Sequence, residues 1–161
     1  MRRNIFLLTT LLCIASPVFA NNQTAKADDI TTDIAGVWKT IDDKTGFSRG
    51  DVLITKNANG TYSGKIIAIR PLPDKPLVSV CLKCKGSLQN APFVGLQVIE
   101  NFTQNPQKPN EFINGSMLDP LSGNVYKGRA RLSTNGKRLT LRGYIGVSML
   151  GRNQTWVRAS D

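Results

Sequence analysis

Short segments of alternating apolar and polar residues, separated by turn signals, are the feature that most restricts the fold of this chain. In residues 124–132, small or apolar residues alternate with lysine and arginine, as in a strand with one buried face. Asn-Gly pairs at 59–60 and 135–136 predict tight hairpin turns, because both residue types tolerate a left-handed backbone. Similar segments recur about every ten residues, which predicts consecutive antiparallel strands.

About eight strands are expected from this pattern. They cover residues 36–41, 51–56, 61–70, 93–100, 112–118, 124–132, 138–145 and 154–158. Two polar connections interrupt the rhythm, 71–92 and 101–110, and the first is expected to form a long irregular loop because it holds four of the eight prolines. Hairpins in sequence order favour a small antiparallel up-and-down β-barrel, since closure removes exposed strand edges. A β-sandwich is the alternative.

The first residues differ in kind from the rest of the chain. Arg2 and Arg3 precede a short apolar run over residues 5–15, and small residues lead to Ala20. This layout is typical of a secretory signal peptide, cleaved after Ala20. We therefore expect a periplasmic or secreted protein without a transmembrane segment after signal cleavage.

Two alternatives to a cleaved signal fit the sequence less well. A membrane anchor needs roughly 20 apolar residues, and the run here is shorter. A lipoprotein needs a small residue directly before its cysteine, but Leu12 precedes Cys13. After the signal, residues 21–33 are expected to form a flexible leader and residues 34–161 a single β-barrel domain.

Charge and composition limit the partners of the domain. The chain has a formal net charge of +10, yet its basic residues are spread without a dense run. Because an exported protein meets little nucleic acid, nucleic acid is not an expected partner. An anionic envelope component or a small anionic ligand fits the charge, and a solvated basic surface without a partner is the alternative.

The absence of histidine from the sequence narrows the chemistry further. It excludes histidine-dependent acid–base catalysis, Ser-His-Asp and Cys-His nucleophile systems, and the commonest zinc and copper sites. The sequence therefore favours a protein without enzymatic activity, without a cofactor and without a metal. An enzyme that uses aspartate with tyrosine or arginine is the minor alternative.

The first and the last predicted strand each carry a tryptophan. Gly36-Val-Trp38 opens the first strand, and Trp156-Val-Arg158 closes the last. This combination resembles the lipocalin and wider calycin pattern, in which an arginine from the last strands covers a tryptophan near the closed end. The resemblance implies a guanidinium stacked on an indole, with Trp38, Trp156 and Arg158 closing the barrel.

A broader resemblance rests on six motifs in order. They are Gly36-x-Trp-Lys-Thr-Ile-Asp42-Asp43-Lys-Thr-Gly46, Cys81-x-x-Cys84-Lys-Gly86, Pro92-Phe-Val-Gly95-Leu, Asp119-Pro120-x-x-Gly123-x-x-Tyr126, Arg142-Gly-Tyr144-Ile-Gly146 and Gly151-Arg152-x-Gln154-Thr-Trp156-x-Arg158. Together they resemble the bacterial family catalogued as domain of unknown function 2147. The resemblance covers nearly the whole mature chain and implies an exported domain with a calycin-like barrel, without an established activity.

Cys81 and Cys84 form the sharpest chemical feature of the sequence. In an exported protein, a close cysteine pair predicts a disulfide, which here would stiffen the proline-rich loop. A redox pair is the first alternative, although redox pairs of this spacing normally open a helix beside a parallel sheet. Half of a metal site is the second alternative, and it lacks further soft ligands.

Five polar residues are candidates for ligand binding. They are Asp43, Tyr126, Arg142, Tyr144 and Arg152. Guanidinium groups bind carboxylates and phosphates in bidentate fashion, so the arginines predict recognition of an anion. If the apolar residues of strand 138–145 point inward, Arg142 and Tyr144 lie outside, unless a bulge inverts the strand. Pinning of the barrel seam by pairing with an aspartate is the alternative role.

Three aspartates have two possible roles. Asp42 and Asp43, with Asp119, could supply paired carboxylates for acid–base chemistry or for calcium. The simpler interpretation is a pair of polar turns whose aspartates bond to their own backbone.

Three functions remain open on the sequence alone. We expect a binding module that holds a small apolar or amphipathic ligand, with an anionic group in some cases, inside the barrel. A structural or envelope-interaction protein with a filled barrel is the second hypothesis. A histidine-free enzyme is the third.

Overall fold

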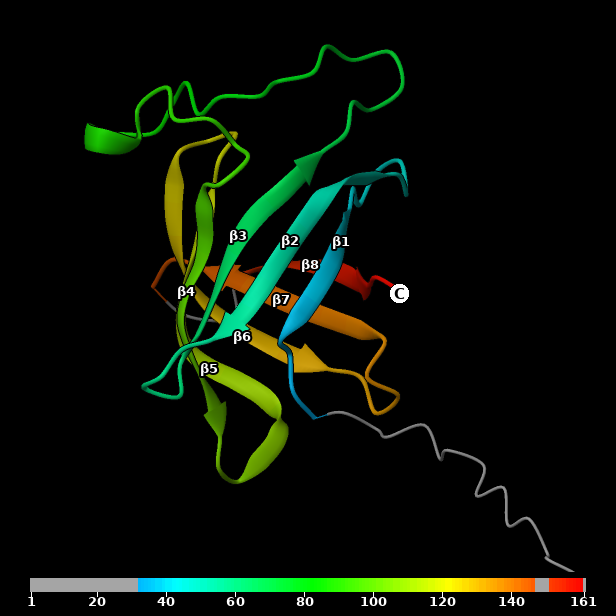
Figure 1. The fold of residues 1–161 in the computed structure, drawn as a ribbon, viewed down its shortest axis with the longest axis vertical. Coiled ribbons are helices and arrows are strands. Elements are labelled where there is room, and N and C mark those ends of the chain that lie inside the picture. The colour runs from blue at the N-terminus through cyan, green and yellow to red at the C-terminus, as the bar shows by residue number, and fades with distance from the viewer. Residues whose placement is uncertain (1–31, 147–150, 161) are drawn as a thin grey trace, which may run out of the picture.

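A computed structural model describes residues 32–146 and 151–160, and within them the chain is an all-β barrel (Figure 1). The predicted signal peptide and most of the predicted leader lie outside the described residues. The strands are β1 (Gly36–Ile41), β2 (Ser48–Lys56), β3 (Tyr62–Ile69), β4 (Gln97–Asn105), β5 (Lys108–Asp119), β6 (Asn124–Leu132), β7 (Arg138–Tyr144) and β8 (Arg152–Arg158), with one short 3-10 helix, η1 (Gly86–Leu88).

The strands pair in sequence order, and β1 pairs antiparallel with β8, so the sheet closes on itself. Trp38 is opposite Arg158 and Thr40 is opposite Trp156 across this last pair. The predicted up-and-down barrel is confirmed, and the sandwich alternative is wrong. Consecutive hairpins place every second connection at the same end, which we call the mouth: the turn 42–47, residues 70–96 and the turn 120–123, with the end of β7 and the start of β8.

The fourth strand was misplaced by the sequence pattern. The prediction began it at Phe93 and placed a long connection over residues 101–110, whereas β4 runs to Asn105 and only residues 106–107 separate it from β5. Asn101 and Asn114 have positive φ, and the register is irregular near Asn101 in the β3–β4 pair and near Asn114 in the β5–β6 pair. Figure 1 shows the β4–β5 hairpin extending beyond the barrel, and none of residues 103–111 is buried, so the apolar alternation is lost there.

Large aromatic side chains fill the half of the barrel away from the mouth. The ring of Phe102 lies directly against the α-carbons of Gly115 and Gly128, where any β-carbon would overlap it. Beside it, the rings of Tyr62 and Phe112 make an edge-to-face contact at 5.3 Å between centroids. All three aromatic residues are fully buried, so this half has a solid core.

We expect Gly115→Val to destabilise the domain by about 1–3 kcal/mol, because the new side chain overpacks against Phe102. Ser116→Thr is the matched control, since it adds a methyl group to the next residue, on the opposite face of β5. Urea unfolding followed by circular dichroism measures both. Equal stability of the two variants would contradict the close packing of Phe102 on Gly115.

Arg158 and Trp38 seal the end opposite the mouth. The guanidinium carbon of Arg158 lies 4.3 Å from the centroid of the Trp38 ring. Its three nitrogens donate to the backbone carbonyls of Asp33, Ala35 and Gly136 at 2.7–2.8 Å. Burial lowers the pKa of Arg158 from its usual value, although a guanidinium remains charged at any ordinary pH.

Gly36 is required by this seal. It has a φ of +125°, and a β-carbon there would lie 3.0 Å from a guanidinium nitrogen of Arg158. The Gly-x-Trp spacing therefore places both Gly36 and the Trp38 indole against the Arg158 guanidinium, and the lack of a side chain at Gly36 leaves room for it. Trp156, expected with Trp38 and Arg158 to close the barrel, lies opposite Thr40 across the β1–β8 pair and also lines the cavity described next.

Candidate functional site: a cavity at the barrel mouth

A cavity of about 850 Å³ occupies the mouth half of the barrel. Side chains from opposite walls line its inner part, and most are apolar: Val52, Ile66, Ile99, Met117, Leu141 and Trp156. Small residues take inward positions in this half, and neighbours pack closely against them. Gly50, buried beside Thr40 on β1, abuts the Ala68 carbonyl, and Gly143, opposite Gly128 and Arg152, abuts Met117.

Ion pairs surround the mouth of the cavity. Arg152 at the start of β8 reaches Asp43 in the β1–β2 turn at 2.9 Å, and Arg70 binds both carboxylate oxygens of Asp51 at 2.6 and 2.8 Å. Hydrogen bonds from Arg70 hold the pKa of Asp51 below its usual value. The Arg152 side chain is 79% exposed, so its pair with Asp43 is solvated and open to exchange with another anion.

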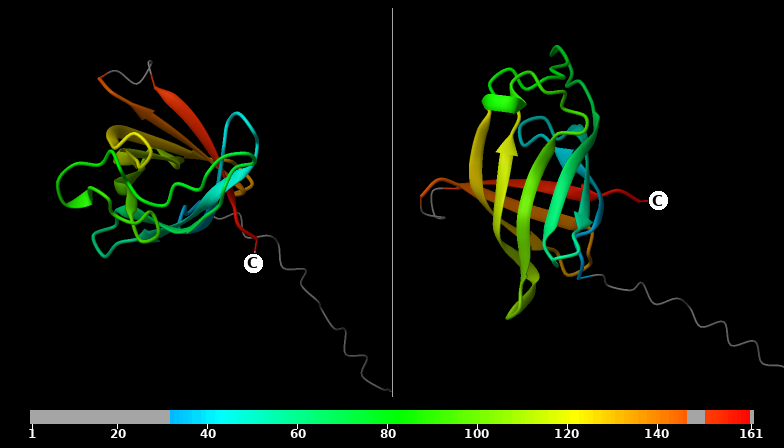
Figure 2. Two further views of the ribbon diagram at one scale, coloured as in Figure 1. Left: turned by 90° about the horizontal axis from the view of Figure 1, so that it is seen from above. Right: turned by 60° about the vertical axis from the view of Figure 1, so that its left-hand side comes forward.

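A long segment crosses the mouth, and we call residues 70–96 the roof segment (Figure 2). Three buried apolar residues fix it to the barrel, Leu72, Phe93 and Leu96. The backbone of Ile66 on β3 donates to Leu96 and accepts from Gly95, which ties the end of the segment to the sheet. The roof segment therefore packs as part of the domain, in the region where the sequence predicted a long irregular loop.

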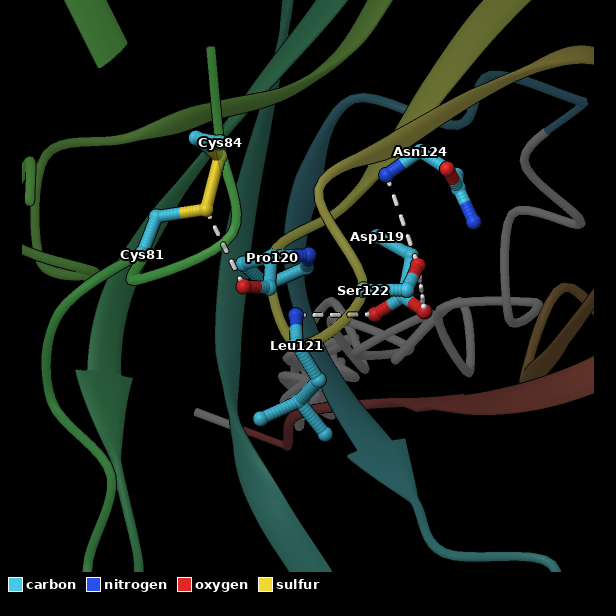
Figure 3. The surroundings of a disulfide bond; sticks show 7 residues. All are labelled: Cys81, Cys84, Asp119, Pro120, Leu121, Ser122 and Asn124. Atoms are coloured by element: carbon cyan, nitrogen blue, oxygen red, sulfur yellow. Dashed lines mark hydrogen bonds between the residues drawn. A yellow bond between two sulfur atoms is a disulfide. The ribbon is translucent and has the colours of Figure 1, made fainter. Parts of the chain in front are cut away.

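The disulfide of the roof segment packs against the β5–β6 turn (Figure 3). Cys81 and Cys84 are bonded and almost fully buried, and the Cys81 sulfur lies 3.1 Å from the Pro120 carbonyl oxygen. A disulfide sulfur has no proton to donate, so this is a sulfur–oxygen contact. Gly123, with a φ of +71°, abuts the Lys83 carbonyl so closely that a β-carbon would overlap it. This burial in an irregular loop favours the structural interpretation of the cysteine pair over a redox one.

Four of the five candidate ligand residues come together. Asp43, Tyr126, Tyr144 and Arg152 all line the mouth half of the cavity. Arg142 does not, because β6 and β7 pair without a bulge from Lys127 to Leu132 and the residue stays on the outer face. Tyr144 shares the parity of Arg142, but it is the last residue of β7, at the mouth, where it lines the cavity. On the outer face the Arg142 guanidinium donates to Asn153 on β8 at 2.9 Å.

Asp42 and Asp119 bond to the backbone of their own turns, as the simpler interpretation proposed, whereas Asp43 pairs with Arg152. Asp42 accepts from the backbone of Lys44 and Thr45 and from the Thr45 hydroxyl, the last of which chiefly lowers its pKa. Asp119 accepts from the backbone of Leu121 and from the Ser122 hydroxyl. Within residues 32–146 and 151–160, no cluster of acidic residues and cysteines is arranged to hold a metal ion.

Several lining residues escaped the sequence analysis. Arg49, Arg70 and Asp51 take part in mouth ion pairs, and the roof residues Leu72 and Phe93 cover the cavity. These residues are hard to predict from the sequence, because the pairing with neighbouring strands determines which of them lie at the mouth. The four prolines of the roof segment mark a loop but do not show which side chains turn inward.

A protein-family match covers the whole barrel. A family model described as "Uncharacterized protein conserved in bacteria (DUF2147)" matches residues 36–158, from the first residue of β1 to the last of β8. The chain belongs to the DUF2147 family. The match includes Gly36, Trp38 and Arg158 of the seal, the disulfide and every strand that lines the cavity.

A solved structure resembles this DUF2147 barrel. It is protein HP1028 from the human pathogen Helicobacter pylori, described as belonging to the lipocalin family. The two share 20% sequence identity with a TM-score of 0.66, over 81% of this chain and 86% of the other. At this identity the likeness shows the fold, and it confirms the lipocalin-like barrel implied by Gly36-Val-Trp38 and Arg158. A comparison with curated proteins found no match.

The described residues were also compared with the length and apolarity that a membrane-spanning helix needs. In residues 32–146 and 151–160, no helix is long and apolar enough to cross a membrane.

Proposed function

We propose that this DUF2147 chain binds a small amphipathic molecule, with the apolar part inside the barrel and an anionic group at the mouth. The observation that carries the proposal is the cavity of about 850 Å³, whose inner wall is mainly apolar. Cavities for small ligands are typically about 300–1,000 Å³, apolar, with a few polar groups that fix orientation. A filled core in one half and a hollow in the other support a ligand that enters from the mouth.

The polar groups at the mouth support an anionic head group. Arg152 is held by the exposed Asp43, and Tyr126 and Tyr144 line the same region. A carboxylate or phosphate would accept hydrogen bonds from the guanidinium, replacing or sharing the pair with Asp43. The apolar chain of such a ligand would lie against Trp156, which is on the same inward face of β8 as Arg152.

The position of Trp156 gives a direct test. A dibrominated stearate quenches tryptophan by contact, so we expect it to quench Trp156 in the cavity while Trp38 beneath Arg158 stays bright. The Trp156→Phe variant should lose the quenching, and the Trp38 signal should remain. Native mass spectrometry of protein extracted mildly from its source should also reveal a bound small mass that denaturation removes. Absence of quenching and a clean unbound mass would together overturn the proposal.

Arg152→Gln should weaken binding of the brominated stearate about tenfold, the effect expected for one hydrogen bond to a charged group. Binding of the matching methyl ester should change little, because the ester carries no charge for Arg152 to meet. Arg142→Gln is the matched control, since Arg142 lies outside the barrel on β7. Equal weakening of acid and ester by Arg152→Gln would contradict a role in head-group recognition.

We also propose that the protein is exported, with cleavage after Ala20, to the periplasm or the medium. The disulfide supports this, because disulfides persist in oxidising compartments, and the family is described as bacterial. N-terminal sequencing of the mature protein tests it. The net positive charge supports contact with an anionic envelope component, in addition to the ligand.

A further inference from the structure

We propose that the roof segment docks the barrel, mouth first, on the surface of a lipid bilayer that contains anionic phospholipid. The docking face consists of the exposed apolar residues Leu77, Val78, Leu82, Leu88 and Val94, the exposed Leu121 of the β5–β6 turn, and Lys75, Lys83 and Lys85. This inference goes beyond ligand binding, because it concerns the outer surface of the protein and is tested without a ligand.

Exposed apolar side chains are concentrated on this segment. Leu82 is 63% exposed, Val94 53% and Leu77 51%, although the segment is fixed to the barrel by buried residues and a disulfide. A folded, anchored loop that keeps such side chains in water presents a surface prepared for a partner. Figure 1 shows the segment running across the upper end of the barrel, beyond the ends of β3 and β4.

Positive charge accompanies these apolar residues. Between residues 70 and 96 the cations are Arg70, Lys75, Lys83 and Lys85, and Asp74 is the one acidic residue. Arg70 is occupied by Asp51, whereas the three lysines are exposed. Interfacial binding depends on two contributions: the insertion of apolar side chains at the headgroup level and the attraction of flanking lysines to anionic lipid.

The same charges decide against a second copy of the chain as the occupant. Two docking faces brought together would put Lys75, Lys83 and Lys85 of both copies into one interface. An anionic bilayer instead complements them. The cavity agrees with a bilayer, because Leu77, Val78 and Leu121 line the cavity as well as being exposed. These three residues join the docking face to the cavity, so the apolar part of an amphipathic molecule would stay against apolar side chains as it moves from bilayer to cavity.

Vesicle flotation tests the docking. The mature protein, without added ligand, is mixed with vesicles of phosphatidylcholine alone or of phosphatidylcholine with phosphatidylglycerol, and its distribution after density-gradient centrifugation is measured. We expect flotation with the anionic vesicles, little with phosphatidylcholine alone, and a decrease as salt rises. Failure to float with anionic vesicles at low salt would overturn the proposal.

Two variants separate the apolar from the electrostatic contribution. Leu77→Asp with Leu82→Asp should lower the partition coefficient by at least about tenfold, since both leucines are mainly exposed and their loss leaves the fold intact. Lys83→Gln with Lys85→Gln should lower it about tenfold and flatten the salt dependence. Val157→Asp is the control: Val157 is 37% exposed at the sealed end, its register partners are Lys39 and Arg138, and flotation should be unchanged.

The remaining outcomes also decide the question. Each variant is checked for its disulfide and its Tm, so that a loss of flotation with an unchanged Tm supports docking by the roof segment. Equal loss from Val157→Asp would assign binding to general charge and overturn the proposal. A dimer in sedimentation that the Leu77→Asp variant dissolves would assign the face to a second copy. Because stearate quenching is measured without vesicles, ligand binding and docking fail independently.

Discussion

Arg158→Ala is expected to lower the free energy of unfolding by about 3–5 kcal/mol, because three hydrogen bonds from a charged group are lost together. The backbone carbonyls of Asp33, Ala35 and Gly136 all accept from this one side chain. Removing it also leaves the buried Trp38 ring without its covering cation. The seal joins both chain ends of the barrel, so its loss should open the β1–β8 seam first.

Two comparisons make this expectation specific. Arg158→Lys keeps the charge but has one ammonium in place of a planar fork, so it should fall between wild type and Arg158→Ala. Arg138→Ala removes an exposed arginine from β7 and should change stability by less than about 0.5 kcal/mol. Urea unfolding with the disulfide intact measures all three. A loss of under about 1 kcal/mol for Arg158→Ala would show that the seal contributes little.

The closed barrel was predictable because its determinants are local. Alternation over residues 124–132 and the Asn-Gly turns specify hairpins, and hairpins in sequence order leave few topologies. Closure was also indicated, since Gly36-x-Trp38 and Arg158 stand on the first and last strands and form the seal only if those strands are neighbours.

The division of the interior into a filled and a hollow half was not predictable. It depends on Phe102 lying over Gly115 and Gly128, three residues on three strands. The bulge near Asn101 shifts Phe102 out of the period-two pattern, so the sequence places this residue in a connection. Strand register determines which side chains pack against each other across the barrel, and the sequence of a single strand does not reveal the register.

The polar residues of the mouth were only partly predictable, again because strand register determines which side chains face inward. Arg152 and Asp43 are 109 residues apart, and their pairing follows from closure of the barrel. Arg142 has the same residue type and a similar neighbourhood in sequence, yet an unbroken β6–β7 register turns it outward. Residue type indicated anion recognition, but strand parity decides which arginine faces the cavity.

Thr40→Trp is expected to weaken binding of oleate by about a hundredfold while the barrel stays folded. Thr40 faces inward between Gly50 and Trp156 and lines the cavity. Because Thr40 lines the cavity, an indole at position 40 would extend into the hollow and occupy the place of the apolar chain. A ligand that loses about 110 Å² of apolar contact, at about 25 cal/mol per Å², loses about 2.7 kcal/mol, which is about a hundredfold in affinity.

The adjacent residue supplies the control for this variant. Lys39→Trp adds the same indole one position earlier on β1, where the side chain is exposed on the outer face, and oleate binding should stay within about twofold of wild type. Equilibrium dialysis with radiolabelled oleate avoids the signal of the added tryptophans. If both variants bind oleate like wild type, the ligand does not enter the barrel, and the exposed apolar roof segment becomes the place to look for it. If only Thr40→Trp fails to bind and its Tm is unchanged, the hollow half of the barrel holds the ligand.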